Sequence, residues 1–173
     1  TAALFTYIQD RLQVEHLTVN YRTPRRIMDR AVAMAQPHSL PVTEVSSVRD
    51  GEEDPLLEQV SPAELTARSA EAVRRVHDRL PGRIAVIAAA DRLRDLAAAI
   101  DSLESVPTVG IGSAGVDDEV AVMTAQDAKG LEFDIVVIVA PAELIDAHGA
   151  GDLYVAMSRS TQHLGVVHSR ELP

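Results

Sequence analysis

Residues 124–132 combine polar side chains with a glycine in a short segment between two apolar runs. Val120 to Met123 precede this segment, and Ile135 to Val139 follow it, apolar at every position. An unbroken apolar run is typical of a strand covered on both faces, so each run predicts a central strand of a parallel sheet. Such sheets hold ligands at the carboxyl ends of their strands. We therefore expect a tight turn at that edge to offer ligand-binding groups: Thr124, Gln126, Asp127, Lys129, Gly130 and Glu132.

Three segments, in order along the chain, resemble motifs of the UvrD-like superfamily 1 helicases. Thr124-Ala-Gln-Asp-Ala-Lys-Gly-Leu-Glu-Phe-Asp134 resembles motif V, whose Lys-Gly-Leu-Glu-Phe core is highly specific. Leu17-Thr-Val-Asn-Tyr-Arg-Thr23 resembles motif IV, and Leu153-Tyr-Val-Ala-Met-Ser-Arg-Ser160 resembles motif VI. The resemblance implies the second, C-terminal RecA-like domain of such a protein, an α/β fold with a parallel sheet and helices on both faces.

The sequences of two segments resemble one branch of this group, the actinobacterial HelD/HelR-type proteins. These segments are Thr18-Val-Asn-Tyr-Arg-Thr-Pro24 and the ending from Val166-Val-His168 to Leu172-Pro173. The branch consists of ATP-driven factors that act on RNA polymerase. In the UvrD family a large insert separates the motif IV half of the domain from motif V, whereas here only about fifteen residues lie between Leu103 and Glu119. This departure argues against duplex unwinding and suits the HelD-type branch, where the insert is small or absent.

The chain lacks the groups that would hold a nucleotide alone. The phosphate-binding pattern Gly-x-x-x-x-Gly-Lys-Ser/Thr is absent, and the six histidines are scattered, with no metal-binding pair. The chemistry expected is therefore contributory. The chain would offer charges and an aromatic ring to ATP held by the first RecA-like domain, which would also hold the Mg²⁺ ion.

Arg159 is the strongest candidate for a catalytic role. The resemblance to motif VI implies an arginine finger, because a guanidinium matches phosphate oxygens and stays protonated. The structural alternative is a surface arginine whose stem lies along an apolar helix face.

The resemblance to motif IV implies that Arg22 makes a second γ-phosphate contact and that Tyr21 stacks on or flanks the base. Alternatively, Asn20 to Pro24 form an ordinary strand-to-helix turn with local caps. A further possibility, a phosphate patch made by Arg22, Arg25, Arg26 and Arg30, is less favoured than a solvated helix face, because the four side chains spread round the helix.

The resemblance to motif V assigns four more positions. Glu132 would accept hydrogen bonds from the ribose hydroxyls; alternatively it caps the following strand or pairs with Lys129. Gly130 would permit a backbone conformation that other residues resist. Thr124 and Gln126 match positions that touch the nucleic-acid backbone, although histidine commonly stands where this chain has Gln126.

Composition limits what the chain binds. Its 16 Lys and Arg face 26 Asp and Glu, and the net charge of −10 opposes sequence-independent binding to a polyanion. Aromatic residues are too few for a single-strand stacking platform. No stretch is long and apolar enough for a membrane span, and the absence of cysteine excludes disulfides and fits the cytoplasm.

Strands alternating with helices predict one RecA-like domain over residues 14–173, preceded by a leader or helix over residues 1–13. We expect strands at 14–19, 41–48, 84–89, 120–123, 135–139 and 164–168. Helices are expected after Thr23-Pro24, from the capping box Ser61 to Glu64, after the strand at 84–89, and around 153–160. Residues 49–59 and the segment after Val139 read as loops, and 106–115 as a crossing segment.

Two functions of different classes follow from these residues. In the first, the chain is the accessory half of an ATP-driven motor that acts on DNA or on RNA polymerase. In the second, it is a non-catalytic module whose acidic surface docks on a protein such as RNA polymerase. An intact phosphate loop upstream in the parent protein would favour the first function.

Overall fold

The computed structural model describes residues 19–38, 46–51, 53–106 and 109–172. The expected leader at 1–13 lies outside these residues, as does most of the two strands expected at 14–19 and 41–48. What is described of those two strands is a short parallel pair, β1 (Val19–Asn20) with β2 (Ser46–Ser47), which is separate from the main sheet.

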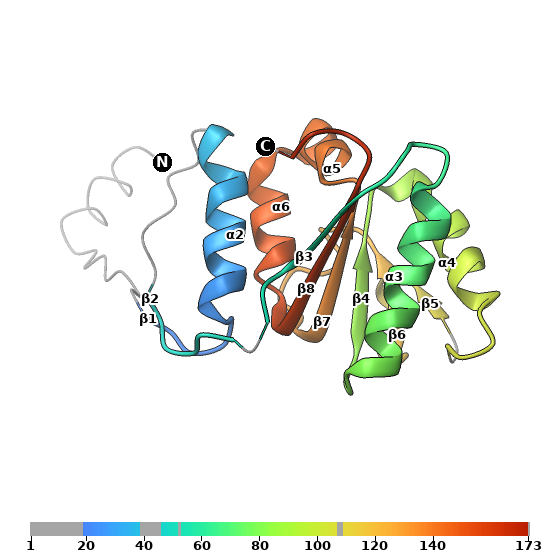
Figure 1. Ribbon diagram of the computed structural model, residues 1–173, viewed down its shortest axis with the longest axis horizontal. Coiled ribbons are helices and arrows are strands. Elements are labelled where there is room, and N and C mark those ends of the chain that lie inside the picture. The colour runs from blue at the N-terminus through green and yellow to red at the C-terminus, as the bar shows by residue number, and fades with distance from the viewer. Residues whose placement is uncertain (1–18, 39–45, 52, 107–108, 173) are drawn as a thin grey trace, which may run out of the picture.

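The main sheet has six strands, and every neighbouring pair is parallel (Figure 1). In order across the sheet, the strands are β3 (Leu56–Gln59), β8 (Ser160–His168), β7 (Phe133–Val139), β4 (Ile84–Ile87), β6 (Val120–Met123) and β5 (Val109–Ile111). The chain therefore forms the parallel α/β sheet that the apolar runs predict.

Helices cover both faces of this sheet (Figure 1). On one face lie α3 (Leu65–Arg79) and α4 (Leu93–Asp101). On the other lie α2 (Arg25–Ala35), α5 (Pro141–His148) and α6 (Ala150–Met157). Short 3₁₀ turns complete the description at Gln36–His38, Ala90–Arg92 and Gly112–Gly115.

The side chains of the central strands divide between two cores because successive residues of a strand point to opposite faces. On β4, Ile84 and Val86 pack against α3 and α4, whereas Ala85 and Ile87 pack toward α2 and α6. All four residues are fully buried. Each buried Ile or Val contributes about 1.5–3 kcal/mol of transfer free energy, so the two-sided burial explains the unbroken apolar runs.

Three expectations about the chain path are wrong. The expected loop at 49–59 ends in the edge strand β3, and the crossing segment at 106–115 contains the edge strand β5. Both strands are short and partly exposed, so neither carries a long apolar signal. The expected loop after Val139 contains α5, which begins with Pro141 at its first turn and buries Leu144.

Two helix starts also differ from the expected caps. Neither Thr23 nor Ser61 caps a helix: α2 is preceded by Pro24 and α3 by Glu64, without side-chain capping bonds. Instead, the Ser61 hydroxyl donates a hydrogen bond to the Glu64 carboxylate at 2.5 Å. Helix α3 begins only at Leu65. Each of the helices α2, α3 and α4 buries one apolar face, and Leu80 and Leu103 lie just beyond the ends of α3 and α4.

Candidate functional site

Residues 124–132 do not form a tight turn at one edge of the sheet. Met123, just before the segment, pairs with Ile87 at the carboxyl end of β4. Phe133, just after it, pairs with Ser160 at the amino end of β8. Because both flanking strands are parallel, the segment must run from the carboxyl edge to the amino edge. Thr124 and Glu132 therefore lie at opposite edges, which corrects the expectation that all six residues, five polar residues and Gly130, share one ligand site.

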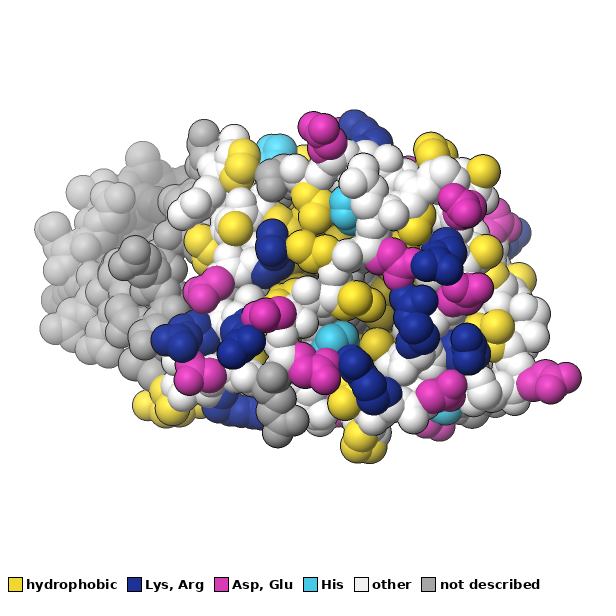
Figure 2. Space-filling model, viewed as in Figure 1, with side chains coloured by type: hydrophobic (Ala, Val, Ile, Leu, Met, Phe, Trp, Pro, Cys, Tyr) yellow, Lys and Arg dark blue, Asp and Glu magenta, His cyan; other side chains and the backbone are white. Residues whose placement is uncertain are grey.

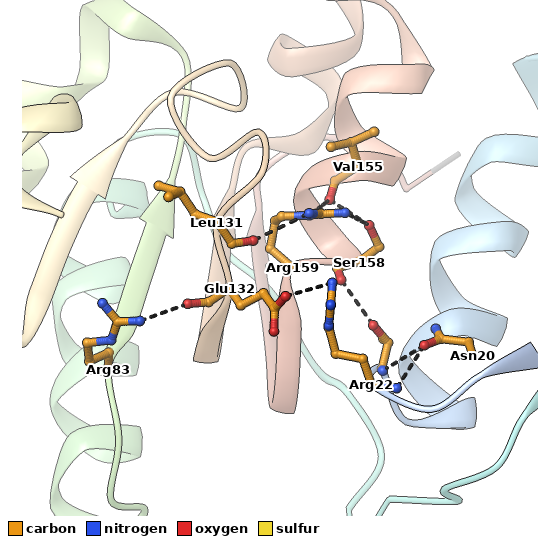
Figure 3. A network of polar contacts seen from close by, with 9 residues as sticks. Asn20, Arg22, Arg83, Leu131, Glu132, Val155, Ser158 and Arg159 are labelled. Atoms are coloured by element: carbon orange, nitrogen blue, oxygen red, sulfur yellow. Dashed lines mark hydrogen bonds and ion pairs between the residues drawn. The ribbon is translucent and has the colours of Figure 1, made fainter. Parts of the chain in front are cut away.

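Arg22 and Glu132 meet at the amino edge although they are 110 positions apart in the sequence. Arg22 Nη1 lies 2.7 Å from Glu132 Oε1, and both side chains are about half exposed (Figure 3). Glu132 does not pair with Lys129, whose Nζ instead lies 3.0 Å from Asp152 Oδ1. The ion pair brings together two residues predicted from different motifs.

Arg159 lies next to this pair, at the turn between α6 and β8. Its Nη1 donates to the carbonyl oxygen of Leu131 at 3.3 Å, immediately before Glu132 (Figure 3). Nε donates to the Val155 carbonyl at 3.1 Å, and Nη2 to Ser158 Oγ at 3.2 Å. The guanidinium therefore lies against the last turn of its own helix, as the structural alternative describes, while also touching the Glu132 segment.

Tyr21 and Gly130 flank the same region. Tyr21 is 71% exposed, so its ring is free for contact from outside the domain. Gly130 has a positive φ of +81°, which confirms the expected conformational demand.

Thr124 and Gln126 are at the carboxyl edge, away from the arginines. Thr124 Oγ1 donates to Asp127 Oδ2 at 2.7 Å and accepts from the Asp127 backbone N–H at 3.1 Å, so its hydroxyl closes a local turn. Gln126 is exposed. At the same edge, Arg92 forms a bidentate pair with Glu143, at 2.5 and 2.6 Å, which joins the turn before α4 to α5.

Three more residues shape the amino edge: Asn20 and Thr23 were expected only as local caps of the turn before α2, and Arg83 was missed by the sequence interpretation. Asn20 Oδ1 accepts from the backbone N–H groups of Arg22 at 2.9 Å and Thr23 at 3.2 Å, which fixes the turn before α2. Thr23 is buried and donates to the Ser158 carbonyl at 3.0 Å. Arg83 Nη2 donates to the Glu132 carbonyl at 3.2 Å (Figure 3). Its guanidinium also lies over the Phe133 ring.

A signal for Arg83 exists in the sequence, since it stands between Pro81-Gly82 and a fully apolar strand. That position places it at the amino end of β4. Three arginines thus surround residues 131–133: Arg83 just before β4, Arg159 between α6 and β8, and Arg22 in the turn before α2. Such a group of cations suits an anionic ligand such as a phosphate.

Two arginines of α2, Arg25 and Arg26, form ion pairs with the acidic segment before β3. Arg25 pairs with Asp50 at 2.6 Å, and Arg26 pairs with Asp54 at 2.9 Å. On the face in Figure 2, basic and acidic side chains are interspersed rather than gathered into a basic stripe. The solvated-face interpretation of Arg25 and Arg26 is therefore favoured over a phosphate patch.

A pocket of about 500 Å³ lies between the segment at 49–53, the start of β8 and the end of α3. His163 lines it and is 3% exposed. Burial lowers the pKa of His163, the nearby Arg79 guanidinium lowers it further, and Glu53 raises it. No group of three or more potential metal ligands occurs within the described parts of the chain. Nor is any described helix long and apolar enough to cross a membrane.

The chain forms a parallel α/β domain of the RecA-like type, and arginines gather at the amino edge of its sheet. Residues 119–167 match the family model described as the UvrD-like helicase C-terminal domain. The fold is similar to the solved structure of the C-terminal domain of a possible DNA helicase from Lactobacillus plantarum WCFS1, with a TM-score of 0.65 and 16% sequence identity. That similarity covers 88% of this chain and 89% of the other. No curated protein matches the sequence.

Proposed function

We infer that this chain is the second motor domain of an ATP-dependent, UvrD-like helicase or translocase. In this role it would complete an ATP site whose phosphate loop and Mg²⁺ ligands belong to the first motor domain. The observation that carries the proposal is the convergence of Arg22, Glu132 and Arg159 at one edge of the sheet, from three segments far apart in sequence. The family match over residues 119–167 supports a motor-domain role.

Arg159 is suited to act as the arginine finger because its present hydrogen-bond acceptors are all neutral. They are two carbonyl oxygens and one hydroxyl. A charge-assisted bond to phosphate is about twice as strong as a neutral one, so a γ-phosphate would compete well for the same N–H groups. As negative charge shifts during phosphoryl transfer, the guanidinium would stabilise it.

Arg22 and Glu132 are suited to exchange partners when nucleotide arrives. Their ion pair is about half exposed on both sides, and such pairs contribute only about 0–1 kcal/mol. Arg22 would then contact the γ-phosphate, while the freed Glu132 carboxylate would accept hydrogen bonds from the ribose hydroxyls. The exposed Tyr21 ring would flank the base, and Gly130 would shape the backbone that presents Glu132.

The test uses the parent protein with both motor halves. Arg159→Ala should lower kcat by about 10³-fold, with a much smaller change in ATP affinity, because the guanidinium meets charge that develops in the transition state. Arg159→Lys should restore little, because a point charge cannot replace the bidentate fork. Arg22→Ala should share the defect. Arg30→Ala, on the outer part of α2, is the matched control and should hydrolyse ATP at the wild-type rate.

Near-normal kcat in a folded Arg159→Ala protein would remove the finger assignment. The arginine would then be a capping group for the end of α6, which is the arrangement its present hydrogen bonds describe.

We further propose that the parent acts on RNA polymerase in the cytoplasm, with Thr124 and Gln126 available for an auxiliary DNA contact. The specific support is the short connection between α4 and β6, which holds one edge strand and a 3₁₀ turn and so carries no inserted domain. The alternative is a non-catalytic module that docks on RNA polymerase through acidic surface. Retention of the parent on purified polymerase, measured by pull-down, tests both; a degenerate phosphate loop in the parent would select the second.

A further inference from the structure

Thr23 makes a contact that its position in the sequence does not predict. A threonine before Pro at a helix start usually caps that helix, yet here the hydroxyl makes no capping bond, and the N–H groups of Arg25 and Arg26 donate to the carbonyl oxygens of Arg49 and Asp50. The Thr23 hydroxyl donates instead to the carbonyl oxygen of Ser158 at 3.0 Å, across 135 positions of sequence. Thr23 is only 2% exposed, so this hydrogen bond is shielded from water and specific in direction.

The acceptor, the carbonyl oxygen of Ser158, lies at the carboxyl end of α6. Ser158 follows the last residue of α6, where carbonyl groups have no partner within the helix. Its hydroxyl donates to the Val155 carbonyl at 2.8 Å and accepts from Arg159 Nη2 at 3.2 Å. Ser158 therefore holds Thr23 through its backbone and Arg159 through its side chain.

The hydrogen bond from the Thr23 hydroxyl to the Ser158 carbonyl joins the residues next to the two arginines. Arg22 immediately precedes Thr23, and Arg159 immediately follows Ser158. We propose that Thr23 is a positioning residue whose bond to Ser158 fixes the separation of Arg22 and Arg159. This inference rests on the proposed function, in which both guanidiniums contact one phosphoryl group.

The packing around the bond explains why it is needed. Ile27 and Ala31 of α2 and Ala156 and Met157 of α6 belong to one apolar core, and this core sets the coarse distance between the helices. Apolar contacts have little directional preference, so a buried hydrogen bond adds a directional constraint that this packing alone does not provide. Asn20 fixes the turn on the Arg22 side. The Thr23 hydroxyl then fixes that turn against the α6–β8 turn.

The test compares Thr23→Val, which keeps the shape and removes the donor, with Thr23→Ser, which keeps the donor, in the full parent protein. Thr23→Val should lower kcat about tenfold or more while leaving KM for ATP within about threefold, because a small misplacement of catalytic groups is costly. Thr23→Ser should restore kcat to within about threefold of wild type, since the hydroxyl is retained. Ser69→Ala is the matched control: it removes a buried hydroxyl from α3, on the other face of the sheet, and should leave kcat unchanged.

A double-mutant cycle separates positioning from general stability. In an Arg159→Ala background, Thr23→Val should cost less than about threefold in kcat, because the bond then has no second arginine to align. An equal loss in both backgrounds, or a folded Thr23→Val protein with normal kcat, would overturn the positioning role. Failure of the proposed function is distinguishable, because Arg159→Ala alone would then leave kcat near normal.

Discussion

Gly82→Ala should destabilise the amino edge of the sheet through a specific steric conflict. Gly82 has a φ of +125°, and a Cβ placed there would lie 2.4–2.5 Å from side-chain atoms of Asp134. The Asp134 carboxylate accepts from the Arg83 backbone N–H at 2.9 Å and from Gln162 Nε2 at 2.8 Å. An alanine would therefore displace the group that joins the starts of β4, β7 and β8.

The magnitude follows from two contributions. A non-glycine residue held at positive φ costs about 1–2 kcal/mol. Loss of the two hydrogen bonds to the partly buried Asp134 adds about 0.5–1.5 kcal/mol each. Gly112 offers a matched control, because it also has positive φ, at +64°, but has no atom within 4 Å of an added Cβ. Gly112→Ala should show a backbone cost without the clash. Because a φ of +125° is also less accessible to alanine than one of +64°, the two variants should differ by at least about 1–3 kcal/mol.

Thermal and urea unfolding of the 173-residue chain measure this difference. For a domain of this size each kcal/mol corresponds to about 2–4 °C in Tm, so Gly82→Ala should melt at least a few degrees below Gly112→Ala. The urea m-values should stay equal, which shows that the comparison concerns the native state. Equal melting temperatures for the two variants would refute the reasoning that Asp134 is displaced.

Three further outcomes are expected. The chain alone should not hydrolyse ATP, because it lacks a phosphate loop; multiple turnover lost on Arg159→Ala would contradict this. It should bind DNA more weakly than about 1 μM at about 150 mM salt, given its net charge of −10, as fluorescence anisotropy would show. Because the pKa of His163 is lowered from 6.5, its neutral form contributes stability above about pH 6.5 that is lost on acidification. His163→Gln should therefore lose less Tm than wild type between about pH 7.5 and 5.5.

Much of the fold could be predicted from the sequence because the central strands are buried on both faces. The runs at 84–89, 120–123 and 135–139 correspond to β4, β6 and β7, since two-sided burial requires apolar residues at every position. The edge strands β3 and β5 were missed because they are short and partly exposed, so their sequences need not be apolar. Periodicity also missed α5, which buries few side chains.

The sequence predicted three residues of the amino-edge cluster but not how they are arranged. The resemblance selected Arg22, Glu132 and Arg159, which the structure brings together. The rule that ligands bind at the carboxyl edge placed Glu132 wrongly, because residues 124–132 cross from the carboxyl edge to the amino edge of the sheet. No local pattern indicates that the Thr23 hydroxyl bonds to Ser158, since the partner is chosen by how α2 and α6 pack.

The course of residues 124–132 across the sheet has a mechanical consequence. Ala125 and Ala128 are fully buried in its middle, and backbone hydrogen bonds from Ala128 to Thr124 and from Leu131 to Ala128 stiffen it. A segment that is buried at its centre and joined to strands at both ends is more rigid than an exposed loop of the same length. Its ends at Thr124 and Glu132 are therefore held at a fixed spacing across the sheet. The carboxyl and amino edges of the sheet are thus joined by a single stretch of nine residues.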